Sequence, residues 1–337
     1  MMQPKIVNIY TQQFDEIAKE FIQIMKKLKN NRSEMPKDFF QYLTKWSLET
    51  IATVSIEKRL NIFNGKTDDE RSKKYMEVSA QFFDKLTDFE LMPSIWKYYQ
   101  TKYFKELMNV YDTMAKITFS YIEEAIKKFE TERFKEVQEE SILRKLLKIN
   151  KQIAFVIAGD ILMPDMVAAA TNFTLYFLAK NLEKQEKLRS EVMKILPNKN
   201  SSIEPKSLQN MPYLKAVIKE SLRLQPIVSG NSRELAKDVV LAGYHVPKGT
   251  MIFMNAYIEL SNPKYYPNPE KFIPERWLRD QQNENWKSKE YNAFSYLLFG
   301  FGSRQDLKSF KKDFLIKFVF FVDLALENVL LNFKWKF

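Results

Sequence analysis

The stretch that decides the fold is PYLKAVIKESLRL, residues 212–224, in which apolar residues recur at the spacing of a helix. Glu220 and Arg223 lie three positions apart in it, so we expect them on one face of that helix. Apolar residues flank the two, which predicts a buried ion pair. A buried carboxylate needs further donors, and the planar fork of a guanidinium suits that role, so Arg276 in FIPERW (272–277) is the expected third member.

A second stretch, SYLLFGFGSRQDLKSF at residues 295–310, places Gly300 and Gly302 between aromatic residues, with Arg304 shortly after them. Because glycine has no side chain, the backbone can pass close to a flat or bulky group. The arginine can then bind an acidic edge of that group. The loop therefore predicts a site that holds such a group.

The composition excludes several kinds of chemistry. The 337 residues include no cysteine and one histidine, His245. This excludes disulfides, Cys/His zinc sites, cysteine nucleophiles and thiol redox chemistry. The apolar content of 45% and the charged content of 28% are ordinary for a globular protein, so the chain can bury a sizeable core.

The net charge of +11 favours an acidic partner, for which an anionic membrane surface, an acidic protein and nucleic acid are the alternatives. Lysines are spread along the chain without a nucleic-acid-binding motif, so we expect no nucleic-acid partner. A merely solvated basic surface is the other interpretation. Residues 1–10 are polar, which predicts no targeting sequence, and the apolar residues 315–326 are too few to span a bilayer.

Helices dominate the first two thirds of the chain. Apolar residues recur every three or four positions along residues 14–28 and 104–122, as in amphipathic helices. Residues 151–181 are apolar almost all round, which predicts a buried helix that is kinked or broken at Pro164. Within residues 238–254, two β-rich runs on either side of a Gly/Pro turn predict a hairpin. The predicted class is mainly α with a small β part.

The order of four motifs resembles the C-terminal half of the cytochromes P450, the haem-thiolate monooxygenases: KESLRL (219–224), GYHVPKGT (243–250), FIPERW (272–277) and FGFGSR (299–304). Three upstream stretches are similar to the arthropod mitochondrial members of that family: residues 36–60, 91–114 and 178–197. The resemblance implies a single cytochrome P450-like domain over residues 1–337. It also implies an incomplete cytochrome P450 fold, because the family's N-terminal part, with its targeting sequence and early haem-contacting helices, has no match.

The resemblance implies a haem b site. Arg233 and Arg304 match positions that hold the haem propionates, where a guanidinium fork binds a carboxylate. The glycine-rich loop supplies three further cofactor-binding positions: Phe299, Gly300 and Gly302. The family's structural triad beneath the haem is matched by Glu220, Arg223 and Arg276.

Two lysines match the site at which mitochondrial members contact the acidic ferredoxin that delivers electrons. Lys215 and Lys219 lie four positions apart and share one helix face. With Glu220 and Arg223 directed inward, we expect both lysines to face solvent; two ordinary solvated lysines are the alternative. The resemblance further implies a hydrophobic small-molecule substrate, such as a sterol or a xenobiotic, and a mitochondrial location on the matrix side of the inner membrane.

The glycine-rich loop departs from the family pattern Phe-Gly-x-Gly-x-Arg-x-Cys-x-Gly, whose cysteine thiolate is the axial iron ligand. Asp306 stands at the cysteine position and Lys308 at the last glycine. Asp306 is a hard oxygen donor and a poor replacement for a thiolate, so we expect no axial ligand for the haem iron, and no other metal ligand is assigned. Residues 305–320 are expected to be an aberrant segment, produced by a mis-joined exon, an alternative splice or a decayed gene.

The predicted central helix also departs from the family, which places an acid followed by threonine over the iron to relay protons for O–O cleavage. Alignment on LYFLAKN (175–181) puts Asp165 at the acid and Met166 at the threonine, and Thr171 is the nearest alternative alcohol. A merely apolar buried helix is the competing interpretation. His245 falls in the predicted hairpin, where a partly exposed strand histidine is preferred over a substitute iron ligand.

The resemblance therefore implies haem-dependent insertion of one oxygen atom from O2 into a hydrophobic substrate, with electrons from a ferredoxin. The missing cysteine predicts that the chain as written is inactive. The alternative, from another class, is a haem-free and catalytically dead remnant that acts at most as a basic helical interaction protein.

Overall fold

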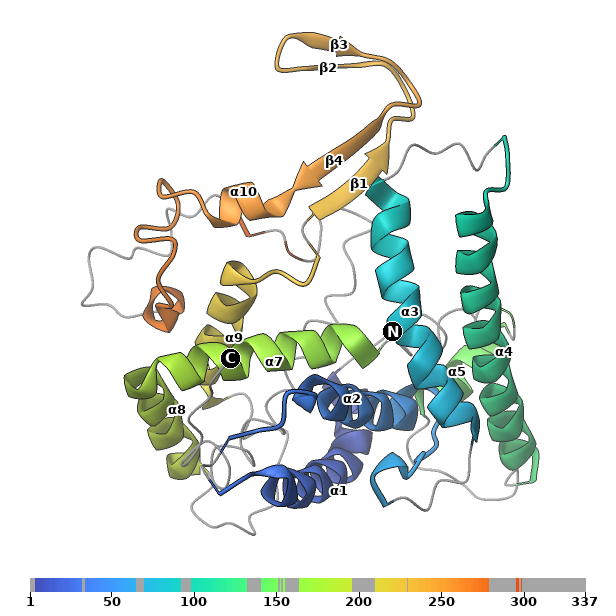
Figure 1. Ribbon diagram of the computed structural model, residues 1–337, viewed down its shortest axis with the longest axis vertical. Coiled ribbons are helices and arrows are strands. Elements are labelled where there is room, and N and C mark those ends of the chain that lie inside the picture. Colours follow the sequence, from blue (N-terminus) through green and yellow to red (C-terminus); the bar gives the residue numbers. More distant parts are fainter. Residues whose placement is uncertain are drawn as a thin grey trace. The chain divides into compact units, whose positions relative to one another are not determined.

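A computed structural model of the chain describes residues 4–31, 34–64, 70–91, 98–131, 141–150, 152, 154, 164–195, 210–228, 230–278, 295, 296 and 298. The described residues form two compact units. One contains those up to Thr171, and the other contains those from Asn172 onward. Helices make up most of the first unit and outweigh the few short strands of the second, which confirms the predicted class (Figure 1).

The first unit is built around two helices that pack on each other, α1 (Pro4–Leu28) and α2 (Phe39–Ser55). One helical turn, η1 (Ile62–Asn64), contacts both, and α5 (Ile142–Ile149) packs on α2. Ser141 caps α5 by accepting a hydrogen bond from the backbone N–H of Arg144, because the first amides of a helix have no partner within it.

The apolar stripe predicted along residues 14–28 forms the core face of α1. Of its predicted members, Phe14, Ile17 and Phe21 are buried, while Ile24 and Leu28 are half-exposed. The ring of Phe21 lies 6.0 Å from that of Trp46 on α2 and 6.5 Å from that of Phe39. Aromatic packing therefore joins the two helices.

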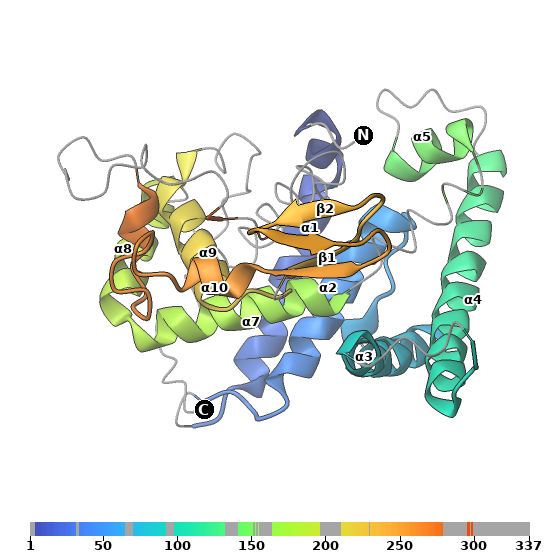
Figure 2. The same ribbon diagram turned by 90° about the horizontal axis from the view of Figure 1, so that it is seen from above.

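The other helix pair of this unit is α3 (Glu70–Leu91) and α4 (Lys102–Thr131), which lie side by side (Figures 1 and 2). Most of the predicted stripe of α4 is buried, but Tyr111 is 49% exposed. Its ring stands 6.2 Å from that of Phe82 on α3, so it covers the edge of the helix contact.

A buried carboxylate fixes the chain that follows α2. Glu49 Oε1 accepts from Arg59 Nε at 2.7 Å and from the backbone N–H of Asn61 at 3.0 Å, and its Oε2 accepts from the N–H of Ile62 at 3.2 Å. Arg59 also donates to Glu20 on α1 at 2.8 Å. The charge of Glu49 is thus compensated where it is buried, and the segment is held against both helices.

The second unit contains most of α7 (Pro164–Lys180), then α8 (Leu182–Ile195) and α9 (Pro212–Leu224). Helix α7 begins at Pro164, and proline suits the first helical position, where its missing N–H has no partner to lose. Residues 155–163 lie outside the described residues, so the predicted kink or break at Pro164 stays a prediction. Within the described part of the chain, no helix is both long and apolar enough to cross a membrane.

The strands of this unit form two antiparallel pairs. β1 (Gly230–Glu234) pairs with β4 (Met251–Asn255), and β2 (Val239–Leu241) pairs with β3 (Tyr244–Val246). The hairpin prediction was wrong about the turn. The paired hairpin closes at Ala242 and Gly243, both with positive φ. The Gly/Pro stretch also turns, with the N–H of Thr250 donating to the carbonyl of Pro247 at 3.3 Å, but it links β3 to β4, which are not paired with each other. The two-residue turn at Ala242 and Gly243 matches strand twist and closes β2 on β3, which leaves β4 to pair with β1.

Candidate functional site

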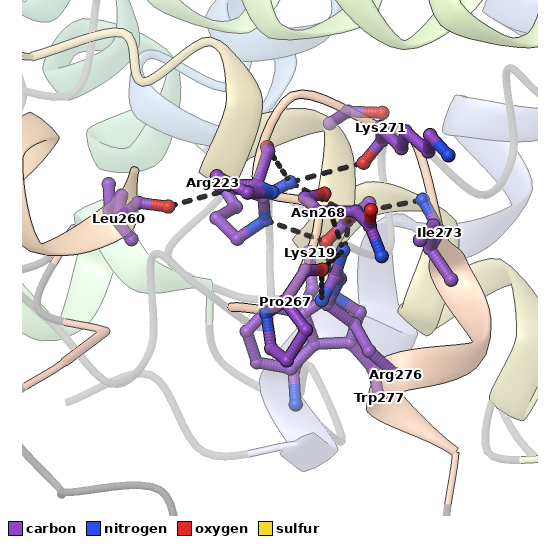
Figure 3. Close-up of polar contacts among 12 residues, drawn as sticks. Lys219, Arg223, Leu260, Pro267, Asn268, Lys271, Ile273, Arg276 and Trp277 are labelled. Carbon is purple, nitrogen blue, oxygen red and sulfur yellow. Dashed lines mark hydrogen bonds and ion pairs between the residues drawn. The ribbon is translucent and has the colours of Figure 1, made fainter. Parts of the chain in front are cut away.

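The carboxylate of Glu220 is fully buried in α9 and accepts five hydrogen bonds, whose donor residues are labelled in Figure 3: Arg223, Ile273, Arg276 and Trp277. Oε1 accepts from Arg223 Nη2 and Arg276 Nε, both at 2.9 Å, and from the backbone N–H of Ile273 at 3.0 Å. Oε2 accepts from Arg223 Nε at 3.0 Å and from Trp277 Nε1 at 2.8 Å. One carboxylate therefore joins α9 to the helical turn η4 (Pro274–Trp277).

Backbone carbonyls at the end of α10 (Ala256–Leu260) and in the loop before η4 accept further hydrogen bonds from the two guanidiniums. Arg223 donates at 2.8–3.3 Å to the carbonyls of Leu260, Pro269 and Lys271. Arg276 donates at 3.2–3.4 Å to the carbonyls of Pro267 and Asn268. Two buried cations face one buried anion, so the partly negative oxygens of the backbone carbonyls compensate the second positive charge.

Aromatic rings complete the Glu220 cluster, by which we mean Glu220, Arg223, Arg276, Trp277 and the loop carbonyls around them. The ring centroid of the buried Tyr266 lies 5.1 Å from Arg223 Cζ and 5.9 Å from Arg276 Cζ, within cation–π range. Its hydroxyl donates to the carbonyl of Ser295 at 3.2 Å. Tyr296 packs edge-on against Trp277 and donates to the carbonyl of Lys219 at 3.3 Å. The cluster thus holds the residues just before the glycine-rich stretch.

Another carboxylate supports the start of α9. Glu191 on α8 accepts from the backbone N–H of Tyr213 at 2.8 Å and from that of Leu214 at 2.9 Å. These are amides of the first helical turn, where the helix dipole favours an anion. Burial raises the pKa of Glu191, although the two amides oppose that shift. The position of Glu220 is therefore set from both ends of its helix.

The comparisons with known proteins agree with this geometry. The family model described as Cytochrome P450 matches residues 1–305. The chain belongs to the cytochrome P450 family.

Similar relatives come from flies. Cytochrome P450 CYP12A2 of Musca domestica is 42% identical over 90% of this chain and 59% of its own length. Probable cytochrome P450 12a5, mitochondrial, of Drosophila melanogaster is 38% identical over 90% of this chain and 59% of its own length. Cytochrome P450 12b1, mitochondrial, of Drosophila acanthoptera is 37% identical over 87% of this chain and 56% of its own length. The chain thus spans less than two thirds of these curated relatives. Their names agree with the predicted arthropod mitochondrial type.

A solved structure supports the fold. A crystal structure of a cytochrome P450 (CYP102L1) superimposes with a TM-score of 0.73 at 17% identity, and it covers 96% of this chain and 69% of its own. This likeness agrees with the predicted cytochrome P450 fold.

The structure brings together three of the predicted site residues, Glu220, Arg223 and Arg276. Arg233 lies on β1, half-exposed, and its Nη1 donates to the carbonyl of the adjacent Ser232 at 2.8 Å. The predicted cofactor positions Phe299, Gly300, Gly302 and Arg304 lie outside the described residues, as do Asp306 and residues 305–320.

The proposed proton-relay residues lie in α7. Thr171 is fully buried, and its Oγ1 donates to the carbonyl of Val167 at 2.8 Å, so its hydroxyl proton is bound to its own helix. Asp165 is in the first turn of α7, but its side chain lies outside the described residues. His245 is an exposed strand residue, as predicted, and its Nε2 lies 3.3 Å from Asp238 Oδ2.

Lys215 and Lys219, the lysines predicted to contact the ferredoxin, are half-buried. The expectation that both face solvent was therefore wrong in part. Lys219 Nζ lies 5.4 Å from the ring centroid of Trp277. Burial lowers the pKa of Lys215, and the charge of Glu191 opposes that shift. Packing against the neighbouring aromatic ring and carboxylate accounts for the difference.

Sequence reasoning missed a second polar cluster beside the first. Glu275 Oε1 accepts from Lys184 Nζ at 3.2 Å, from Lys187 Nζ at 3.1 Å and from the Tyr213 hydroxyl at 3.0 Å. Lys187 also lies 4.7 Å from the ring centroid of Tyr213. The available signal was Glu275 itself, a carboxylate next to a predicted buried arginine. The contact ties α8 to η4.

The donor set of the chain does not fit the family's cofactor. Cytochromes P450 bind haem iron through a cysteine thiolate, and these 337 residues contain no cysteine. Among the residues that the structure describes, no group of three or more His, Cys, Asp or Glu side chains is placed to hold a metal ion. The ligand on which the family's oxygen chemistry depends is therefore missing from this sequence.

Proposed function

We propose that this chain is the scaffold of a mitochondrial-type cytochrome P450 and that, as written, it has lost the iron ligand of a haem monooxygenase. The reaction of the intact enzyme would be insertion of one oxygen atom from O2 into a hydrophobic substrate such as a sterol or a xenobiotic. The observation that carries the proposal is the five-donor carboxylate of Glu220, which ties α9 to η4 in a chain of this family.

The electron donor of the intact enzyme would be an acidic, mitochondrial-type ferredoxin that binds at Lys215 and Lys219. The net charge of +11 supports an acidic partner, because opposite charge steers encounter and sets orientation. The names of several fly relatives include the word mitochondrial, which supports the same compartment for this protein.

A second candidate function is favoured by one observation, the absence of cysteine from the whole sequence. In that case the chain is a haem-free remnant that acts at most as a basic helical interaction protein. The polypeptide would keep the Glu220 cluster for its own stability and carry out no oxygen chemistry.

Sequencing of the transcript across codons 300–322 separates the two candidates. A cysteine codon restored near position 306 would support the monooxygenase. The repaired protein should then bind haem and show the thiolate-type absorption shift of its carbon monoxide complex. A transcript that encodes SRQDLKSF would make the haem-free candidate the better one.

A further inference from the structure

Lys219 lies over an indole ring. Its Nζ stands 5.4 Å from the ring centroid of Trp277, within cation–π range, and both residues are labelled in Figure 3. Of the aromatic side chains, tryptophan attracts a cation most strongly. The attraction comes from the quadrupole of the ring, which carries no net charge. The contact therefore orders the ammonium group without neutralising it.

The ring beneath Lys219 is itself fixed by the Glu220 cluster. Its Nε1 donates to Glu220 Oε2 at 2.8 Å, and the ring of Tyr296 stands edge-on to it with the centroids 4.9 Å apart. The hydroxyl of the same tyrosine donates to the backbone carbonyl of Lys219 at 3.3 Å. The ring of Trp277 and the main chain of Lys219 thus share a neighbour, and the cluster sets the place of the ammonium group on α9.

The ordered lysines of α8 differ from Lys219 in their charge balance. Lys184 and Lys187 lie 3.2 and 3.1 Å from Glu275 Oε1, so a carboxylate offsets part of their positive charge. At Lys219 the ordering contact is with an uncharged ring. A cation that is held in place by such a ring keeps its charge for an acidic partner, and opposite charge fixes the orientation of a complex as well as its encounter rate.

A lysine side chain has a large rotamer entropy, and ordering such a side chain at an interface weakens binding. A lysine that is ordered beforehand avoids that loss. We propose that Trp277 is a positioning residue, which holds Lys219 in the orientation in which an acidic ferredoxin binds it. The inference rests on the proposed function, which assigns the ferredoxin to Lys215 and Lys219.

The test is a double-mutant cycle on the affinity of the full chain for a purified mitochondrial-type ferredoxin at low salt. The cycle combines Trp277→Leu with Lys219→Gln. Trp277→Phe is measured beside Trp277→Leu, because both lack the Nε1 donor to Glu220 and only Phe keeps a ring under the lysine. The difference between these two variants separates the ring from the hydrogen bond. Circular dichroism and thermal melting show that each variant folds.

Two controls match the cycle. Tyr176→Leu removes a ring whose centroid lies 5.0 Å from Nζ of the exposed Lys180 on α7, and it should leave the affinity unchanged. The losses from Trp277→Leu and Lys215→Gln should add, since the ring lies under Lys219.

Trp277→Leu should weaken ferredoxin binding about two- to tenfold, and Trp277→Phe should weaken it less. In the Lys219→Gln background, neither change of the tryptophan should weaken binding further. If Trp277→Leu does not fold, Trp277→Phe takes its place in the cycle and the same comparison decides.

Equal losses from the tryptophan change with and without Lys219 would overturn the inference, because they would show a purely structural role. The proposed function would survive that result if Lys215→Glu/Lys219→Glu still weakens binding. An affinity that does not respond to Lys215→Glu/Lys219→Glu, or a parent chain that does not bind the ferredoxin, would overturn both.

Discussion

Arg276 Nε lies 2.9 Å from Glu220 Oε1, although 56 positions separate the two residues in the sequence. The contact is fully buried on both sides, so neither charge can be solvated by water if the other is lost. It joins α9 to η4 and, through the carbonyls that bind both arginines, orders the loop between them. We expect the second unit to depend on this cluster more than on any exposed ion pair.

The first prediction concerns Arg223→Ala, which should abolish soluble folding. Loss of one partner of a buried pair costs about 3–5 kcal/mol, a large part of a typical free energy of unfolding of about 5–15 kcal/mol. Soluble yield and thermal melting measure the effect. The control is Lys74→Ala, which removes an exposed pair with Glu77 of the same sequence spacing and should cost less than about 1 kcal/mol. An Arg223→Ala protein that melts like its parent would refute the prediction.

The second prediction concerns Trp277→Phe. The variant keeps an aromatic ring against Tyr296 but removes the Nε1 donor, which leaves Glu220 with one hydrogen bond fewer in a buried site. We expect the free energy of unfolding to fall by about 1–3 kcal/mol, the cost of an unsatisfied buried polar group. Urea unfolding measures it. An unchanged midpoint of urea unfolding would contradict the prediction, because it would mean that the other four donors satisfy the Glu220 carboxylate.

The third prediction is a dependence on pH through Glu275. Burial by itself would raise the pKa of this carboxyl, but its backbone hydrogen bond and the donors Lys187, Tyr213 and Lys184 outweigh burial and hold the pKa below its usual range. A carboxyl with a lowered pKa stabilises the fold above its unfolded-state pKa, about 4.3, and this contribution is lost as the pH falls through the folded-state pKa.

Glu275→Gln should therefore be less stable than the parent at neutral pH and should lose less stability on acidification below about pH 5. Melting temperatures measured across that range provide the test. Glu183→Gln is the control, because this carboxylate on α8 is 89% exposed and lies 3.7 Å from Lys184. Parallel curves of melting temperature against pH for Glu275→Gln and the parent would exclude the Glu275 carboxyl as the source of the pH dependence.

The fourth prediction concerns the ferredoxin and uses a repaired, full-length protein. Lys215→Glu/Lys219→Glu should weaken binding of a mitochondrial-type ferredoxin strongly at low salt and much less at high salt, where screening already removes the attraction. Lys73→Glu/Lys74→Glu makes the same change of charge at exposed positions of α3 and is the control. Because Lys215 and Lys219 are half-buried, a melting curve must first show that the variant folds. Equal affinity of the folded variant and the parent at low salt would end the proposal.

The sequence predicted the centre of the cluster because helical spacing places Glu220 and Arg223 on one face, and because a buried carboxylate needs a second cation. It could not predict the donors Ile273 and Trp277, since their positions depend on the path of the loop before η4. The Gly/Pro stretch does form a turn, as its local signal indicates, but which strands pair across a turn depends on the other strands, and the paired hairpin closes at Ala242–Gly243. The partial burial of Lys215 likewise depends on the packing of α9 near Glu191 of α8, a residue far from Lys215 in the sequence.

The central claim is that this chain has the scaffold of a cytochrome P450 without its thiolate ligand. The most direct test is the absorption spectrum of the purified protein after addition of haem, reduction and exposure to carbon monoxide, with an intact cysteine-containing cytochrome P450 as the positive control. We predict that the control shows the thiolate-type shift of the main haem band and that this protein does not, because no other side chain reproduces that ligand. A thiolate-type band from the pure protein would contradict the claim.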